Sequence, residues 1–97
     1  MSNQKTPILF IEIEGNDMKN EMRRDAVEVA VQGLNNQKLT SELEVAKFIK
    51  KKFDSKYGET WVCVVGSEFG SVVTPMPGHY ILFRVGNMSI QLFKLKK

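Results

Sequence analysis

Cysteine and histidine are almost absent from this chain, which has one residue of each. Cys63 has no second cysteine for an internal disulfide, and Cys63 and His79 do not occur at the spacing of metal ligands. Within its apolar run, Cys63 is interpreted as a small buried side chain, and His79 as a polar residue at the start of a strand. The sequence therefore predicts no metal site, no cofactor and no enzymatic activity.

Long apolar runs and a strong net charge are missing as well. No stretch is long enough to cross a membrane, and residues 1–15 lack the basic start and long apolar run of a secretory signal, which favours the cytosol. The net charge is only +3, and its lysines gather at residues 50–56 and 94–97. We interpret them as a solvated helix face and a basic end, and expect neither a nucleic-acid nor a membrane partner.

What is present is the composition of a small globular protein, with 42% hydrophobic and 26% charged residues. At 97 residues the chain is predicted to form a single domain, residues 1–97, with flexible ends at 1–7 and 95–97. Because so short a chain leaves much apolar surface near water, we also expect it to form an oligomer.

A strand at residues 8–13 and two helices are predicted in the first half of the chain. Apolar residues between 22 and 34 recur at helical spacing, and Asp17 or Asn20 is the expected cap of this first helix. Ser41 followed by Glu44 forms a capping box at the start of a second helix. Gly58 then supplies a conformation with positive φ at the end of that helix.

The second half is rich in β-forming residues. Residues 61–65 are apolar enough for a central strand covered on both faces, and residues 69–74 are typical of a short edge strand. Residues 75–78 contain two prolines and should leave the sheet, before a hairpin of residues 79–85 and 88–95. The predicted fold class is α+β: a strand, two helices, then four antiparallel strands.

The edge strand at residues 69–74 has two interpretations. Unpaired N–H and C=O groups on such a strand can accept an extended peptide as a further strand. Alternatively, the segment is an ordinary strand paired within its own chain. The residue pattern does not favour either interpretation over the other.

Three segments carry a family resemblance: NDMKNEMRRDAVEVA at residues 16–30, the pattern KKxFDxKYxxTWxCxVGxxFGSxVT at residues 50–74, and HYILFRVGNMSIQLFK at residues 79–94. Together they resemble the light chain eight-type dynein light chain family, the small dimeric hub of dynein and other complexes. The resemblance implies a two-fold dimer, with sheets flanked by helices, in which residues 69–74 cross to the partner's sheet. It also implies two symmetric grooves, each of which binds an extended client segment by strand addition.

The resemblance also assigns residues to these surfaces. In the dimer interface it places Trp61, Val62, Cys63, Phe69, Ser71 and Val73. In the peptide-binding groove it places Glu42, Ser67, Glu68, Phe69, Gly70, Ser71, Val72, Val73, Thr74, Tyr80 and Leu82. Glu42 is expected from the opposite subunit, and Gly70 would let the client backbone approach closely.

Several groove positions depart from the residues usual in the family, namely Leu43, Ser67, Glu68, Val72, Pro75, Leu82 and Arg84. Val62 stands where the family usually has an interface histidine whose protonation splits the dimer, so this dimer is expected to persist at mildly acidic pH. These departures suggest a specialised paralogue, with an axonemal dynein subunit as the natural candidate.

The predicted function is that of a non-enzymatic light chain that holds two dynein intermediate chains together, as a homodimer or as a heterodimer with a related light chain. It would act in the cytoplasm and cytoskeleton, or in the axoneme of a cilium. The alternatives are a general dimerisation hub or a regulatory binder of clients unrelated to dynein, and a small basic nucleic-acid binder.

Overall fold

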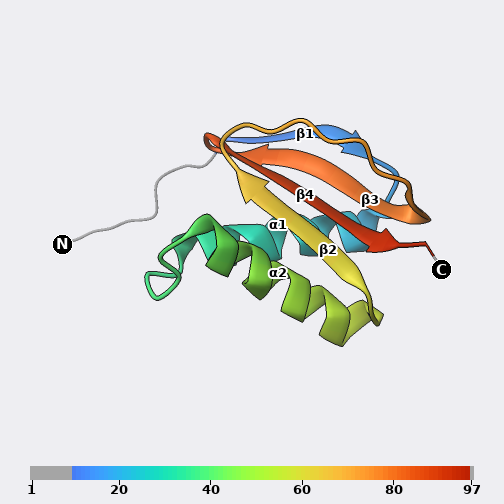
Figure 1. The fold of residues 1–97 in the computed structure, drawn as a ribbon, viewed down its shortest axis with the longest axis horizontal. Helices are drawn as coiled ribbons and strands as arrows, with labels where there is room; N and C mark the ends of the chain where they lie inside the picture. The colour runs from blue at the N-terminus through green and yellow to red at the C-terminus, as the bar shows by residue number, and fades with distance from the viewer. Residues whose placement is uncertain (1–9, 97) are drawn as a thin grey trace.

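Four antiparallel strands and two helices form the part of the chain that the computed structural model describes, residues 10–96 (Figure 1). The strand order in the sheet is β1-β3-β4-β2. The α+β class is confirmed. The elements are β1 (Ile11–Asn16), α1 (Asn20–Asn35), α2 (Glu42–Tyr57), β2 (Trp61–Gly66), β3 (Pro75–Val85) and β4 (Met88–Leu95).

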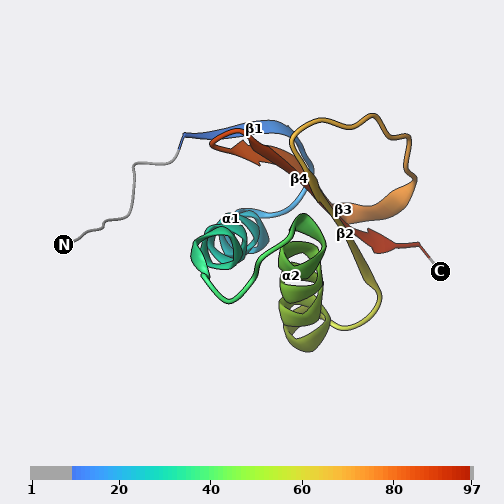
Figure 2. The same cartoon turned by 60° about the vertical axis from the view of Figure 1, so that its left-hand side comes forward.

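Both helices pack on the same face of the sheet, and the core lies between them and the strands (Figure 2). Trp61 of β2 is fully buried there, with its ring 4.9 Å from that of Phe53 on α2. The helices approach each other at Gly33, where an added Cβ would lie 3.0 Å from the Phe48 side chain. The 3.6-residue spacing of the sequence therefore predicted the buried sides of both helices.

One half of the predicted capping box at the start of α2 is confirmed: Ser41 caps the helix, but the Glu44 carboxylate reaches the amide of Thr40 instead of that of Ser41. The Ser41 hydroxyl accepts a hydrogen bond from the Glu44 amide at 3.2 Å, and the Glu44 carboxylate accepts from the Thr40 amide at 2.8 Å. At the other end Gly58 has a φ of 82°, which favours glycine. The Asp54 carboxylate accepts from the Trp61 amide at 2.8 Å and so ties the end of α2 to β2.

The predicted cap of α1 is wrong. The N-cap position is Lys19, without a side-chain hydrogen bond to the helix, and Asn20 is already helical. Asp17 instead accepts hydrogen bonds from the amides of Gly78 and Tyr80, at 2.9 and 3.0 Å. A short polar side chain near a helix start has several possible backbone partners, and here the tertiary fold brought β3 closer than the helix end.

Besides the predicted strand at residues 69–74, which does not form, the strand predictions need three corrections. β1 begins and ends later than predicted, and residues 8 and 9 of its predicted span lie outside the described residues. β2 lies at the edge of the sheet in this chain, not at its centre, because β4 pairs with one side of it only. Residues 75–78 do not all leave the sheet: Pro75 pairs with Leu95 at the first position of β3, where a missing N–H is tolerated.

The hairpin of β3 and β4 is confirmed, with Val85 opposite Met88 across its two-residue turn. Between Pro75 and Tyr80 the register of this pair shifts, so the intervening residues bulge out of the ladder. Within residues 10–96, no helix is long and apolar enough to cross a membrane.

Candidate functional site

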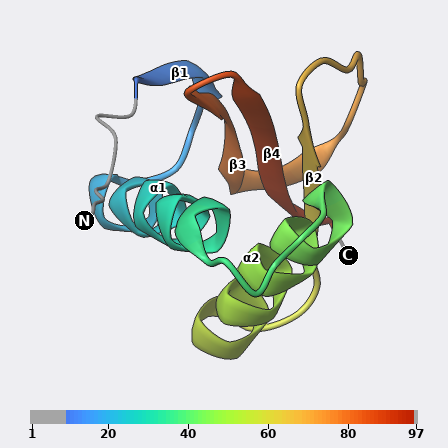
Figure 3. The ribbon, with the colours of Figure 1, turned by 90° about the vertical axis from the view of Figure 1, so that its left-hand side faces the viewer.

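The segment between β2 and β3, residues 67–74, forms an arch on the side of the sheet away from the helices (Figure 3). The predicted strand at 69–74 does not form in this chain, because the backbone of the arch has no hydrogen-bonding neighbour among the described residues. Val72 is 100% exposed, and a Cβ added at Gly70 would meet nothing within 4 Å. The arch is therefore open to a partner along its length.

Beneath the arch lies the outer face of the sheet, which no helix covers. Side chains alternate between the faces of a strand, and residues opposite each other in neighbouring strands share a face. The outer face therefore includes Val62 and Val64 on β2, Tyr80, Leu82 and Arg84 on β3, Ser89, Gln91 and Phe93 on β4, and Glu12 and Gly15 on β1.

The outer face changes in polarity from one end to the other. Val62, Phe93 and Tyr80 lie opposite one another and form an apolar row. The next row consists of Val64, Gln91 and Leu82. Two residues beyond that row, Ser89 of β4 lies opposite Arg84 of β3, whose guanidinium donates to the Ser89 hydroxyl at 2.8 Å. A ligand on this face therefore meets an apolar end and a polar end, where Glu12 of β1 lies opposite Arg84 and where Glu14 and Glu68 line a hollow with it.

Gln91, between these rows, is only 2% exposed although it is polar. Its amide nitrogen donates to the Ser71 hydroxyl at 2.8 Å, and Ser71 is in turn 3.1 Å from the Gln91 amide oxygen. This pair joins the middle of the arch to β4 and satisfies the buried amide. Sequence reasoning missed Gln91; its one signal was a polar residue within the apolar strand pattern of β4.

Two hollows adjoin the arch. One, of about 410 Å³, is lined by Glu68, Phe69, Gly70, Ser71, Tyr80 and Leu82 together with Glu14, Arg84, Ser89 and Gln91. The other, of about 480 Å³, is lined by Asn16, Asp17, Ser71, Val72, Val73, Pro75, Tyr80 and Gln91. The structure thus brings together most residues of the predicted peptide groove, but Ser67, Thr74 and Glu42 line neither hollow.

Glu42 lies apart from the arch, at the first residue of α2 on the helix side of the sheet. It is exposed in this chain. A role for Glu42 in the groove therefore requires the second subunit that the resemblance implies, and stays a prediction.

The predicted interface residues on β2 point in different directions. Trp61 belongs to the core and Cys63 packs against it, whereas Val62 lies on the outer face. Burial raises the pKa of the Cys63 thiol to about 12, so the thiol is protonated at neutral pH. Among these three, only Val62 offers its side chain to a partner on the outer face; Trp61 and Cys63 can contribute the backbone of the free strand edge.

No group of His, Cys, Asp and Glu that could hold a metal occurs within residues 10–96. The His79 ring is engaged with its own strand, its Nδ1 lying 2.8 Å from the Pro77 carbonyl oxygen.

A family model described as dynein light chain type 1 matches residues 11–95, which is nearly the whole described chain. The chain belongs to the dynein light chain family. The cytoplasmic dynein light chain of Emericella nidulans is 43% identical over 94 residues, covering 97% of this chain and 98% of that protein. Membership of the family now accounts for the motif at residues 50–74 and for the fold in which that motif lies.

Solved structures agree on the fold of this light chain. Two structures of the dynein light chain-like domain of a calcium-binding protein from Fasciola hepatica superpose with TM-scores of 0.79 and 0.76. Each is 21% identical, and they cover 91% and 90% of this chain and 93% of theirs. At that identity the likeness concerns the fold alone.

Proposed function

We propose that this light chain is a two-fold dimer that binds extended segments of dynein intermediate chains by strand addition and holds two such chains together. Membership of the family supports association with dynein and dimer formation, and it favours an adaptor without enzymatic activity. The partner light chain is a second copy or a related chain.

One observation carries the proposal. The same chain has a free strand edge on β2 and an arch of unpaired backbone beside it. If the arch of each chain pairs with the β2 edge of the other, a two-fold axis satisfies both sets of backbone groups at once. The outward edge of each crossed arch is then the edge to which a client strand adds.

Two grooves in one dimer also explain how modest contacts give firm binding. Once one client chain of a pair is bound, the second binds from a high effective concentration, without new contacts.

The departures at the groove favour a specialised axonemal light chain, while the relative named as cytoplasmic favours cytoplasmic dynein. Co-purification of the tagged chain with either class of intermediate chain decides between these complexes.

Gly70→Trp tests the groove, because a Cβ added at this position would meet no atom of the single chain within 4 Å, and the indole would cover the edge to which the client adds. We expect peptides that tile dynein intermediate chains to bind the native protein and to lose binding to the variant by at least about 100-fold, as measured by calorimetry. Gln37→Trp is the matched control, because it adds the same side chain to an exposed turn between the helices.

Unchanged binding by Gly70→Trp would contradict strand addition at the arch. A monomeric mass for the native protein in light scattering, at concentrations where the peptides bind, would contradict the dimer. If soluble proteins other than intermediate chains bind the groove and intermediate chains do not, the chain is instead a regulatory binder.

A further inference from the structure

The basic face of α2 is the strongest charged feature outside the arch and the outer face. We define it as Leu39, just before the helix, and Lys47, Phe48, Lys51, Lys52 and Ser55 on α2. These residues lie on the helix side of the sheet, whereas the arch lies on the opposite side (Figure 1). Within one chain, a partner on the basic face would therefore lie on the other side of the sheet from a client at the arch.

Three lysines of this face have no carboxylate partner. The two ion pairs within residues 10–96 join Lys50 to Asp54 and Lys56 to Asp25, each at 2.6 Å. Lys47, Lys51 and Lys52 form none. Glu44, which lines a hollow with Lys47 and Lys51, accepts from the Thr40 amide through Oε1 and forms no ion pair with either lysine.

The spacing of these lysines works against the helix. Lys47 and Lys51 are four residues apart, as are Lys52 and Lys56, and like charges at this spacing repel on a helix surface. Bound carboxylates would relieve that repulsion. The face is therefore complementary to a partner with several negative charges.

The basic face is also hollowed around an aromatic ring. Phe48 and Lys51 line two hollows of about 320 Å³ each, one completed by Leu39, Glu44 and Lys47 and the other by Lys52 and Ser55. The Lys52 ammonium lies 5.5 Å from the centre of the Phe48 ring. An apolar side chain seated beside Leu39 and Phe48 would lose contact with water while its neighbours meet the lysines.

We propose that the basic face docks an acidic polypeptide segment that carries an apolar anchor residue. A peptide fits better than a nucleic acid, because Glu44 and Glu59 line hollows with Lys47 and Lys51 and would repel a continuous line of phosphates, whereas Asp54 is paired with Lys50. A peptide can place its acidic side chains only where lysines lie. The proposal does not depend on strand addition at the arch.

The test uses the full chain and a fluorescently labelled peptide of Asp and Glu residues with one central Leu. Fluorescence anisotropy measures the affinity of the chain for this peptide. We expect Lys47→Glu/Lys51→Glu to weaken binding by at least about tenfold. Replacing the central Leu of the peptide by Ala should weaken it by about tenfold, because the anchor is lost. Gly70→Trp should leave the affinity unchanged, since the arch lies on the other side of the sheet.

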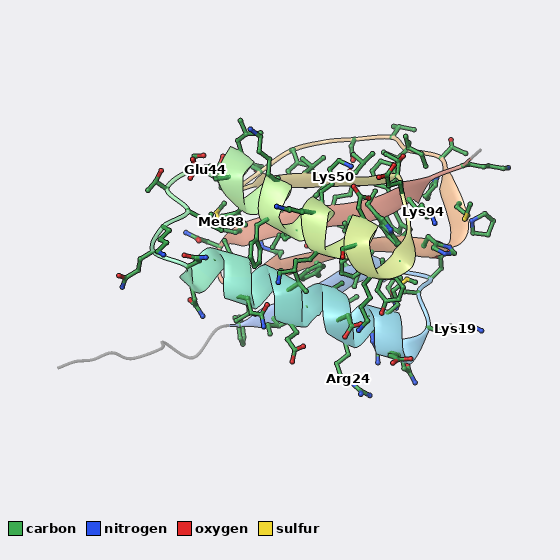
Figure 4. All side chains as sticks on the ribbon, turned by 90° about the horizontal axis from the view of Figure 1, so that it is seen from below. Lys19, Arg24, Glu44, Lys50, Met88 and Lys94 are labelled. Carbon is green, nitrogen blue, oxygen red and sulfur yellow. The ribbon has the colours of Figure 1, made fainter. Side chains whose placement is uncertain are left out.

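Lys19→Glu/Arg24→Glu is the matched control, because it makes the same change of charge at two exposed positions, the N-cap of α1 and the helix itself; Figure 4 labels both residues, with Glu44 and Lys50 on α2. Equal losses in both double variants would reduce the effect to net charge and overturn the proposal. So would equal affinity for the peptide with Ala, loss of binding in Gly70→Trp, or tighter binding of a single-stranded oligonucleotide of the same charge. Far-UV circular dichroism checks that each variant stays folded.

Discussion

The two faces of the sheet differ in how completely other elements of the chain bury them. On the helix side, Trp61, Ile81, Phe83, Ile90 and Leu92 are fully buried by elements of the same chain. On the outer face, the valines of β2 and the β3 side chains remain partly exposed, and the arch touches β4 through the Ser71–Gln91 pair.

This difference separates what keeps the chain folded from what makes it associate. The helix side gains its stability from apolar burial that needs no second molecule. The outer face and the edge of β2 keep apolar surface and backbone groups available, which is what a dimer with strand addition requires. Variants of the two faces should therefore affect different measurements.

The largest effect is expected from Phe53→Ala on the helix side. Phe53 is 1% exposed, and its ring packs against those of Tyr57, at a tilt, and Trp61, edge to face, so truncation leaves a cavity in the core. We expect the free energy of unfolding to fall by about 3–5 kcal/mol in urea denaturation. Val72→Ala, at a fully exposed position, should change it by less than about 0.5 kcal/mol. Similar values for the two variants would contradict the division between the faces.

Val62→Asp on the outer face should separate association from folding. A carboxylate in the apolar row with Phe93 and Tyr80 would lose its hydration on dimer formation. We expect the dissociation constant of the dimer to rise by at least about 100-fold in sedimentation equilibrium, with unchanged helix content. Gln32→Asp, an exposed change on α1, is the control and should stay dimeric. If the Val62→Asp protein stays dimeric, the outer face is not part of the dimer interface.

A smaller effect is expected at the contact between the helix ends. The Asp25 carboxylate accepts hydrogen bonds from Lys56 and from the Tyr57 hydroxyl, and these lower its pKa. Burial and the bond to Asp25 raise the pKa of Tyr57 to about 12. Tyr57→Phe should cost about 1 kcal/mol at neutral pH in urea denaturation.

The pH dependence of that contact has a definite sign. Because folding lowers the pKa of Asp25 below its ordinary value of 3.8, its contribution is present above that pH and is lost as the pH falls through the lowered value. The difference between native protein and Tyr57→Phe should therefore shrink in strong acid. A difference that grows on acidification would show that Asp25 is not the partner that matters.

The smallest expected effect is on the dimer between neutral pH and pH 5. Val62 has no proton to gain in the apolar row, so the sedimentation coefficient should not change over this range. Monomers at pH 5 in a protein that keeps its helix content would show that another titrating group controls association. The Val62→His variant provides the matched comparison, because it introduces a titrating group and should dissociate on acidification.

Much of the fold could be predicted because the signals were local. The Ser41 and Glu44 capping box, the apolar spacing in both helices and the short hairpin turn each depend on residues within a few positions of one another. Most of the predicted groove residues line the two hollows beside the arch, and their role in binding a client stays a prediction.

The errors fell where the outcome depended on distant residues. Asp17 was expected to cap α1, and its position beside β3 depends on a strand far along the chain. Gln91 was missed because its burial depends on Ser71 in the arch. A pattern in one segment carries no information about which distant segment will satisfy its polar groups.

The sequence by itself determined both helices and the β3–β4 hairpin, because helical periodicity and tight turns are short-range properties of neighbouring residues, and its motif at residues 50–74 indicated the family. Only the tertiary structure decided that β2 lies at an edge, that the arch is unpaired and that one face of the sheet is left without helices. Those outcomes follow from strand order, since a backbone edge is free or occupied only according to which distant strand reaches it.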